Sequence, residues 1–129
     1  MKKHLPIFLL SLLSIALHIA WKMYTGYTAE DAYITFGFAK RIMEGYGFVY
    51  NIGTPIYGTT TPLFTLLMTP WMFLSSDPAL GATLLGLGGF IGGLLFLYFS
   101  LNKWEDIFTL IPLALCLPMI AENMSGMEM

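Results

Sequence analysis

The stretch ALGATLLGLGGFIGGLLFLYFSL, residues 79–101, decides the fold class, because its 23 residues carry no charge. About 20 apolar residues in a helix span the hydrocarbon core of a bilayer, which is roughly 30 Å thick. A second uncharged run extends from Leu5 to Trp21. Of all 129 residues, 57% are hydrophobic and 11% are charged, whereas soluble domains are about 25% charged. The sequence therefore predicts an all-α integral membrane protein.

The N-terminal charges predict the orientation in the membrane. Lys2 and Lys3 precede the first apolar run, and the cytoplasmic flanks of spans are enriched in such residues. We interpret residues 5–24 as a retained signal anchor, because no small-x-small cleavage site follows them. The N-terminus is then cytoplasmic, and the chain beyond Trp21 emerges on the outer face of an inner or plasma membrane. Lys22 suits that outer interface, where long amines reach the head groups.

Residues 25–61 are expected to form the first outer loop. Thr28 is a candidate N-cap that would place Glu30 and Asp31 in the first turn of a helix. Apolar residues recur at helical spacing over about residues 29–44. This pattern predicts an amphipathic juxtamembrane helix that lies along the outer surface. An irregular, glycine-rich loop follows it.

The next apolar segment, residues 62–75, is too short for a simple span. A helix of about 13 residues extends about 20 Å, which is less than the thickness of the hydrocarbon core. We therefore favour an interfacial or re-entrant helix, with a short true span as the alternative. Residues 107–124 form a further span, which Pro112 and Pro118 should kink. The fold class thus contains three transmembrane helices, or four if 62–75 crosses.

Glycines in the middle of the 79–101 span predict a close neighbour. Gly88 and Gly92 form one GxxxG pattern, and Gly89 and Gly93 form a second. Small residues at this spacing let two helices approach closely in lipid, so we expect this face to contact another helix. Three or four spans also make a small bundle. We therefore expect the chain to be a fragment of a larger membrane protein or one half of a split protein, with further transmembrane helices as its partners.

Glu30 and Asp31 are the leading candidates for chemistry. Two adjacent carboxylates at a membrane boundary are costly to desolvate, so they need solvent, partners or a function. Asp31 could deprotonate an acceptor hydroxyl as a general base. The competing interpretation is that both acids only complement the N-terminus of a helix.

Other polar side chains carry alternatives of the same kind. Lys40 and Arg41 could bind a phosphate or diphosphate head group, or they could only contact lipid phosphates. The three threonines before Pro62, at 59–61 and including Thr60, could contact a sugar, or their hydroxyls could cap the helix that follows. His18, in the first span, is expected to hydrogen-bond a neighbouring helix rather than to relay protons.

Composition also argues against several functions. The formal net charge is −2 and there is no basic run, so nucleic acid is not an expected partner. The sequence has no histidine or cysteine cluster and no phosphate-binding glycine loop of the P-loop kind, so no metal or cofactor is expected. The single cysteine, Cys116, lies in an apolar run and is expected to be a packed thiol.

Two stretches of the outer loop carry a recognisable pattern: residues 30–40 read EDAYITFGFAK, and residues 44–53 read EGYGFVYNIG. They resemble the first outer loop of GT-C-fold glycosyltransferases, and most of all that of bacterial arabinofuranosyltransferase-like membrane proteins. In that family an acidic pair starts a juxtamembrane helix, and a glycine-rich EGxGxVxNxG loop follows. Residues 57–67 (YGTTTPLFTLL) and 125–128 (SGME) resemble two later motifs of the family. The likeness runs in order through residues 1–129.

The resemblance implies a transferase that takes a sugar from a polyprenyl-phosphate donor and passes it to a glycan, lipid or protein acceptor at the outer face of the lipid bilayer. Asp31, the second acid of the pair, is then the candidate base, with Glu30 and Glu128 as supporting acids. The candidates for substrate binding become Lys40, Arg41, Asn51 and Thr60.

Three positions depart from the family pattern. Glu30 replaces the first of two aspartates, Gly37 stands where an arginine is frequent, and Tyr57 stands where an acid often precedes the glycine. These positions concern donor-phosphate binding and acceptor choice. Members of the family have many more spans, so the resemblance implies that this chain is the N-terminal piece of such an enzyme. The isolated chain is expected to be inactive, because most of the donor pocket would lie in the rest of the enzyme.

Topology decides whether the acids can meet. If residues 62–75 do not cross the membrane, Glu128 returns to the outer face with Asp31. If they do cross, Glu128 is cytoplasmic and cannot join the site.

Two other function classes stay open. The chain could be a non-catalytic truncated homologue or a membrane scaffold subunit. It could also be a transporter fragment in which Glu30, Asp31 and His18 handle ions. Transport predicts charged or broken segments at mid-membrane, whereas the acidic pair lies at the membrane boundary.

Overall fold

The computed structural model describes residues 4–53, 58–101 and 104–126, with the backbone alone for 104–106. In these ranges the regular secondary structure is entirely helical, without a strand, which confirms the all-α fold class. In chain order the helices are α1 (Leu5–Thr25), α2 (Ala32–Met43), α3 (Pro62–Leu74), α4 (Pro78–Ser100), the 3-10 helix η2 (Trp104–Thr109), α5 (Leu110–Ala114) and α6 (Leu117–Met124).

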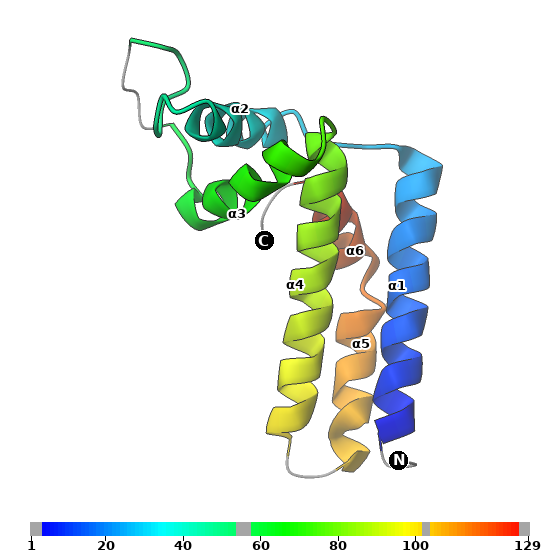
Figure 1. The fold of residues 1–129 in the computed structure, drawn as a ribbon. Helices are drawn as coiled ribbons and strands as arrows, with labels where there is room; N and C mark the ends of the chain where they lie inside the picture. The colour runs from blue at the N-terminus through cyan, green and yellow to red at the C-terminus, as the bar shows by residue number, and fades with distance from the viewer. Residues whose placement is uncertain (1–3, 54–57, 102–103, 127–129) are drawn as a thin grey trace.

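Two helices, α1 and α4, are each long and apolar enough to cross a membrane. α1 has 21 residues and α4 has 23. Figure 1 shows them side by side and running in opposite directions. The end of α1 at Thr25 and the start of α4 at Pro78 therefore lie at the same end of the bundle, which is called the loop end below.

A third apolar segment, α5 with α6, is broken in the middle. Residues 107–114 and 117–124 together are long and apolar enough for a span, and they are bent by 56°. Pro118 accounts for the break, because it has no N–H to donate to the carbonyl of Ala114 one turn earlier. That carbonyl instead accepts a hydrogen bond from the Ser14 hydroxyl of α1 at 2.9 Å. The kink predicted from the prolines is confirmed, and the described chain has two candidate spans, or three if the bent pair is one.

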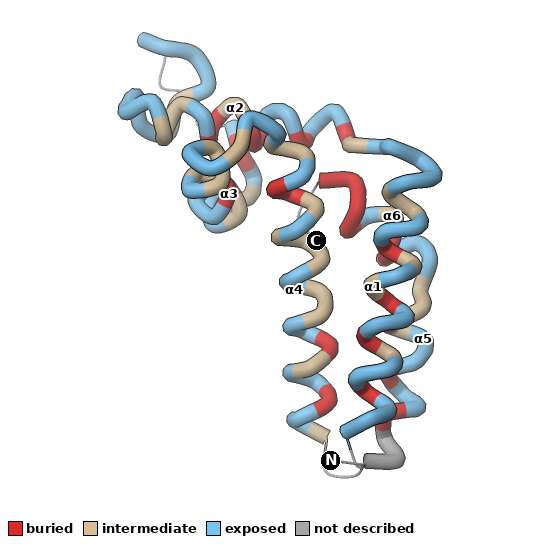
Figure 2. Tube along the Cα trace, turned by 45° about the vertical axis from the view of Figure 1, so that its right-hand side comes forward, coloured by how far each residue is buried: buried red, intermediate tan, exposed pale blue. Residues whose placement is uncertain are grey.

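The core of the bundle joins α1, α4 and the η2–α5 segment away from the loop end. Its buried side chains are Ile7, Leu94, Tyr98, Ile107, Leu110 and Ala114. Figure 2 shows buried residues recurring along the sides of the helices that face each other. The opposite side of α1 carries exposed large apolar side chains: Leu5, Phe8, Leu9, Leu12, Leu13 and Ile19. An outer surface this apolar suits lipid rather than water.

α2 and α3 lie across the loop end of the bundle instead of alongside the long helices (Figure 1). They pack on each other and on the start of α4 through a second buried cluster, Ala32, Phe36, Ala39, Met68 and Ala82. The Trp71 indole N–H donates to the carbonyl of Asp77 at 2.8 Å. The Asp77 side chain in turn accepts the Leu80 amide at 3.1 Å and caps α4. The turn from α3 into α4 is thus held by its own hydrogen bonds.

The expectation for the GxxxG face of α4 is wrong for the part of the chain that the structure describes. The face consists of Gly88, Gly89, Gly92 and Gly93, all exposed, and a Cβ added at any of them would meet no atom within 4 Å. Two other glycines of α4 make the close approaches. A Cβ on Gly81 would overlap the Trp71 ring, and one on Gly86 would lie 2.8 Å from the carbonyl oxygen of Asn123. The spacing of small residues shows that another helix can approach closely, but it does not identify the face of the helix where such a contact forms.

Candidate functional site

Lys22 fastens the end of α1 to two segments that are distant in the sequence. α1 ends just before Gly26, which has the left-handed φ of 59°. Lys22 Nζ donates to the carbonyl of Tyr27 at 2.7 Å and to Thr28 Oγ1 at 3.0 Å. It also donates to the carbonyl of Met124 at 2.9 Å. An ammonium has three N–H groups, and here they hold the start of the outer loop against the end of α6.

The first two residues of the SGME stretch pack on the start of the same loop. The amide of Ala29 donates to the carbonyl of Ser125 at 2.7 Å. Gly126 has a φ of 83°, a conformation that favours glycine. A Cβ there would lie only 3.3 Å from Thr28 Cγ2. Such a Cβ would also lie 3.5 Å from Ala32 Cβ, so the 30–40 and 125–128 stretches, which carry the family resemblance, meet at the loop end. Glu128 lies outside the described residues.

Glu30 and Asp31 form the turn that precedes α2. α2 begins at Ala32, so neither acid lies in its first turn, contrary to expectation. Both side chains are exposed, and the Asp31 carboxylate makes no capping hydrogen bond although it occupies the N-cap position. The prediction that Thr28 caps this helix is also wrong, because its hydroxyl is bonded to Lys22. No capping hydrogen bond from Asp31 therefore supports the interpretation that the acidic pair only complements the N-terminus of a helix.

Asp31 lines a small pocket between the start of α2 and the segment before α3. The pocket measures about 190 Å³ and is also lined by Thr35, Gly58, Thr59 and Thr60, with Ala32 and Ile34. Thr59 is buried, and its Oγ1 lies 3.4 Å from Thr65 Oγ1. Thr60 is exposed and is not the cap of α3, whose N-cap position is Thr61. The structure therefore brings two predicted site residues, Asp31 and Thr60, to one pocket.

Asn51 lines a second cavity beside the first. This cavity measures about 270 Å³ and is also lined by Phe38 and Tyr50. Ile34 and Gly58 line both cavities, so the two cavities are neighbours along one face of α2. Ligand sites typically measure roughly 300–1,000 Å³, so either cavity alone suits part of a ligand.

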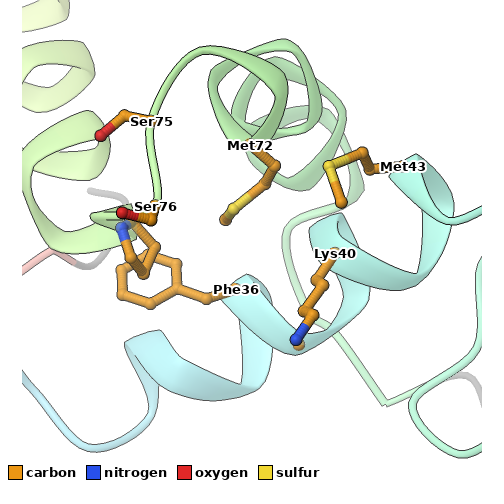
Figure 3. A pocket seen from close by; sticks show the side chains of 8 residues that line it. Phe36, Lys40, Met43, Met72, Ser75 and Ser76 are labelled. Atoms are coloured by element: carbon orange, nitrogen blue, oxygen red, sulfur yellow. The ribbon is translucent and has the colours of Figure 1, made fainter.

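Lys40 and Arg41 are not brought to this pocket. Arg41 Nη1 lies 2.6 Å from Glu44 Oε2, and Lys40 Nζ lies 3.9 Å from Glu44 Oε1. Lys40 instead lines a groove of about 440 Å³ between α2 and the α3–α4 turn (Figure 3). The groove and the Asp31 pocket share no lining residue. The physical reason is helical: Lys40 follows Asp31 by about two and a half turns, which places it on the opposite side of α2.

His18 joins two helices inside the bundle, as expected. Its Nδ1 lies 2.7 Å from the carbonyl oxygen of Ser14, and its Nε2 lies 3.5 Å from Asn123 Nδ2. A carbonyl only accepts, so Nδ1 carries the proton, and Nε2 of the neutral ring accepts from the Asn123 amide. Among the described residues, no three histidine, cysteine or acidic side chains gather as metal ligands.

Comparison with known proteins gives no match to a family model, a curated protein or a solved structure.

Proposed function

We propose that this chain is the N-terminal part of a membrane glycosyltransferase that moves a sugar from a polyprenyl-phosphate donor to an acceptor at the outer membrane face. One observation carries the proposal. Asp31 lines a pocket together with Thr60 at the loop end of the bundle, and its carboxylate makes no capping hydrogen bond. A carboxylate at head-group depth can reach the hydroxyl of an acceptor and the phosphate-linked carbon of a lipid-bound donor.

The proposed reaction needs one base and a stable leaving group. Asp31 takes the proton of the acceptor hydroxyl while the oxygen of that hydroxyl forms a bond to the anomeric carbon of the sugar. The bond between that carbon and the phosphate oxygen breaks, and polyprenyl phosphate leaves with the electron pair. Glu30 adjoins the base in the sequence. Glu128 is proposed as the second supporting acid on the family resemblance alone, because it lies outside the described residues.

The two cavities suggest which residues bind the substrates. Thr60 offers a hydroxyl in the Asp31 pocket, and Asn51 offers an amide in the neighbouring cavity. We therefore propose these two residues as sugar or acceptor ligands. Lys40 lies on the other side of α2 and Arg41 pairs with Glu44, and neither lines the Asp31 pocket, so neither belongs to the proposed reacting centre.

The broken segment α5–α6 bears on the transport alternative. A break at mid-membrane can expose backbone carbonyls that coordinate ions. Here the carbonyl freed by Pro118, that of Ala114, is already bonded to the Ser14 hydroxyl. His18 is likewise engaged by Ser14 and Asn123. These polar groups are engaged in fastening helices together, which favours the transferase over a transporter.

The test of the proposed function uses the full protein that carries this chain, purified and reconstituted in liposomes. Radiolabelled sugar on a polyprenyl-phosphate donor is supplied together with a mixture of membrane glycolipid acceptors. Transfer to an acceptor, or slow donor hydrolysis without one, supports the proposal. Neither product, in a protein that keeps its fold, points to a scaffold subunit, and ion flux through the liposomes points to a transporter.

A further inference from the structure

The groove that Lys40 lines combines an apolar floor with a single charge. Figure 3 shows Met43 and Met72 extending into the space between α2 and α3, with Phe36 and Lys40 along its α2 side. Its volume of about 440 Å³ lies within the roughly 300–1,000 Å³ that is typical of ligand sites. Methionine side chains adapt to ligands of variable shape. The groove is therefore suited to a flexible apolar chain that ends in an anion.

The charge of Lys40 is only loosely neutralised. The Glu44 carboxylate lies 2.6 Å from Arg41 but 3.9 Å from Lys40, whose side chain is 62% exposed. Within the described ranges, no other acidic side chain forms an ion pair with Lys40. Lys40 is also the only charged residue among those that line the groove. An anion in the groove would thus meet a cation and no opposing carboxylate in the lining.

The groove lies at the end of the candidate spans. Ser76 and Pro78, which line it, belong to the turn that opens α4, and α4 is long and apolar enough to cross a membrane. Segments at the end of a span lie at the level of the lipid head groups. A hydrocarbon surface beside a cation at that depth matches a phospholipid of the same leaflet.

We propose that this groove binds an anionic phospholipid of the surrounding bilayer. Its phosphate pairs with the Lys40 ammonium, the rim hydroxyl of Ser76 donates to a head-group oxygen, and part of an acyl chain lies against Met43 and Met72. The lipid would fill the space between α2 and the α3–α4 turn and so support α2 from the side opposite Asp31. The inference is independent of glycosyl transfer, because the groove shares no lining residue with the Asp31 pocket.

Native mass spectrometry of the 129-residue chain, released from detergent micelles, tests this. Phosphatidylglycerol and phosphatidylcholine of equal chain length are titrated against the wild type, K40Q, K40R and the double variant R41Q/E44Q. The double variant is the matched control, because it removes the adjacent cation of α2 together with the carboxylate that pairs with it, and neither residue lines the groove. We expect one phosphatidylglycerol to bind in preference to phosphatidylcholine. K40Q should lower that preference by about five-fold, the contribution of one lysine at an anionic surface, while K40R and R41Q/E44Q should retain it.

Three outcomes would overturn the inference. Equal losses in K40Q and R41Q/E44Q would indicate diffuse charge rather than a site. A wild type without preference for phosphatidylglycerol would indicate that no anionic lipid is selected. Stoichiometric displacement of phosphatidylglycerol by a polyprenyl phosphate at lower concentration would assign the groove to a donor lipid instead. Glycerol phosphate as competitor separates the head group from the whole amphiphile, and it should not displace the lipid.

Discussion

The amide of Ala29 and the carbonyl of Ser125 form a 2.7 Å hydrogen bond between the acidic turn and the end of α6. Both residues are buried, at 7% and 2% exposure, so water competes little for this bond. It joins two stretches that are far apart in the sequence. The position of the acidic pair therefore depends on the return of the α5–α6 segment to the loop end of the bundle.

Gly126→Ala should loosen this junction. The change forces a Cβ into a positive φ and brings it to 3.3 Å from Thr28, so we expect a loss of about 1–2 kcal/mol in the free energy of unfolding. Gly89→Ala is the matched control, because a Cβ there meets nothing within 4 Å and helical alanine is preferred to glycine by about 0.5–1 kcal/mol. Unfolding in mixed micelles measures both, and equal stability of the two variants would contradict the described junction.

Gly81→Ala should destabilise the contact between α3 and α4. The added Cβ overlaps the Trp71 ring, and overpacking of this kind costs about 1–3 kcal/mol. Gly88→Ala, on the open face, should cost nothing. A double-mutant cycle with Trp71→Ala checks the cause, since the penalty of Gly81→Ala should largely vanish once the ring is gone. Additive effects of the two changes would show that the ring is not what the new methyl group meets.

Lys22→Met should separate α1 from the end of α6. The change removes three hydrogen bonds from an ammonium, of which the bond to Met124 is the one that links distant segments. Loss of a charged hydrogen-bonding group costs about 1.5–3 kcal/mol. Lys40→Met serves as control, because its exposed side chain should change stability by no more than about 0.5 kcal/mol. If Lys22→Met were as stable as the control, the hydrogen bonds of Lys22 would not contribute to stability, and its ammonium would only be solvated.

The topology can be tested by labelling cysteines from one side of sealed vesicles, in a protein with Cys116→Ala. Tyr24→Cys and Ser76→Cys place exposed thiols at the loop end, and Ser100→Cys places one at the far end of α4. If α3 does not cross the membrane, a membrane-impermeant reagent outside labels the first two and spares the third. Labelling of Tyr24→Cys and Ser76→Cys from opposite sides would show that residues 62–75 span.

The long helices could be predicted closely from the sequence, because an uncharged run of span length leaves few alternatives. A helix is observed at Pro78–Ser100, where the 79–101 span is expected, and another at Leu5–Thr25, where the 5–24 span is expected. The kink near Pro118 was also predictable, since proline lacks the N–H that a continuous helix needs. In contrast, the hydrogen bond from Ser14 to the freed carbonyl depends on which helices become neighbours. Local sequence does not determine that.

The candidate site could be predicted only in part. Asp31 and Thr60 were both candidates, and they do line one pocket. Lys40 is a further candidate for substrate binding from the sequence, but helix geometry places it on the opposite side of α2. No local pattern identified Lys22 or Gly81, because the roles of both arise from partners brought close by the fold. A lysine in the last turn of a span is so common that it indicates an interface and nothing more.

The proposed role of Asp31 as the base of the transfer reaction is tested most directly by Asp31→Asn in the full protein. The amide keeps the size and shape of the side chain but cannot take the proton. The measurement is the initial rate of sugar transfer from a polyprenyl-phosphate donor at equal expression, beside Glu122→Gln, which neutralises an exposed acid of α6 that lines none of the described cavities. We predict a loss of about 10²–10⁴-fold for Asp31→Asn, the usual contribution of a positioned base, and a rate within about two-fold of wild type for the control. Wild-type turnover by Asp31→Asn would contradict the account and leave the acidic pair as no more than the start of a helix.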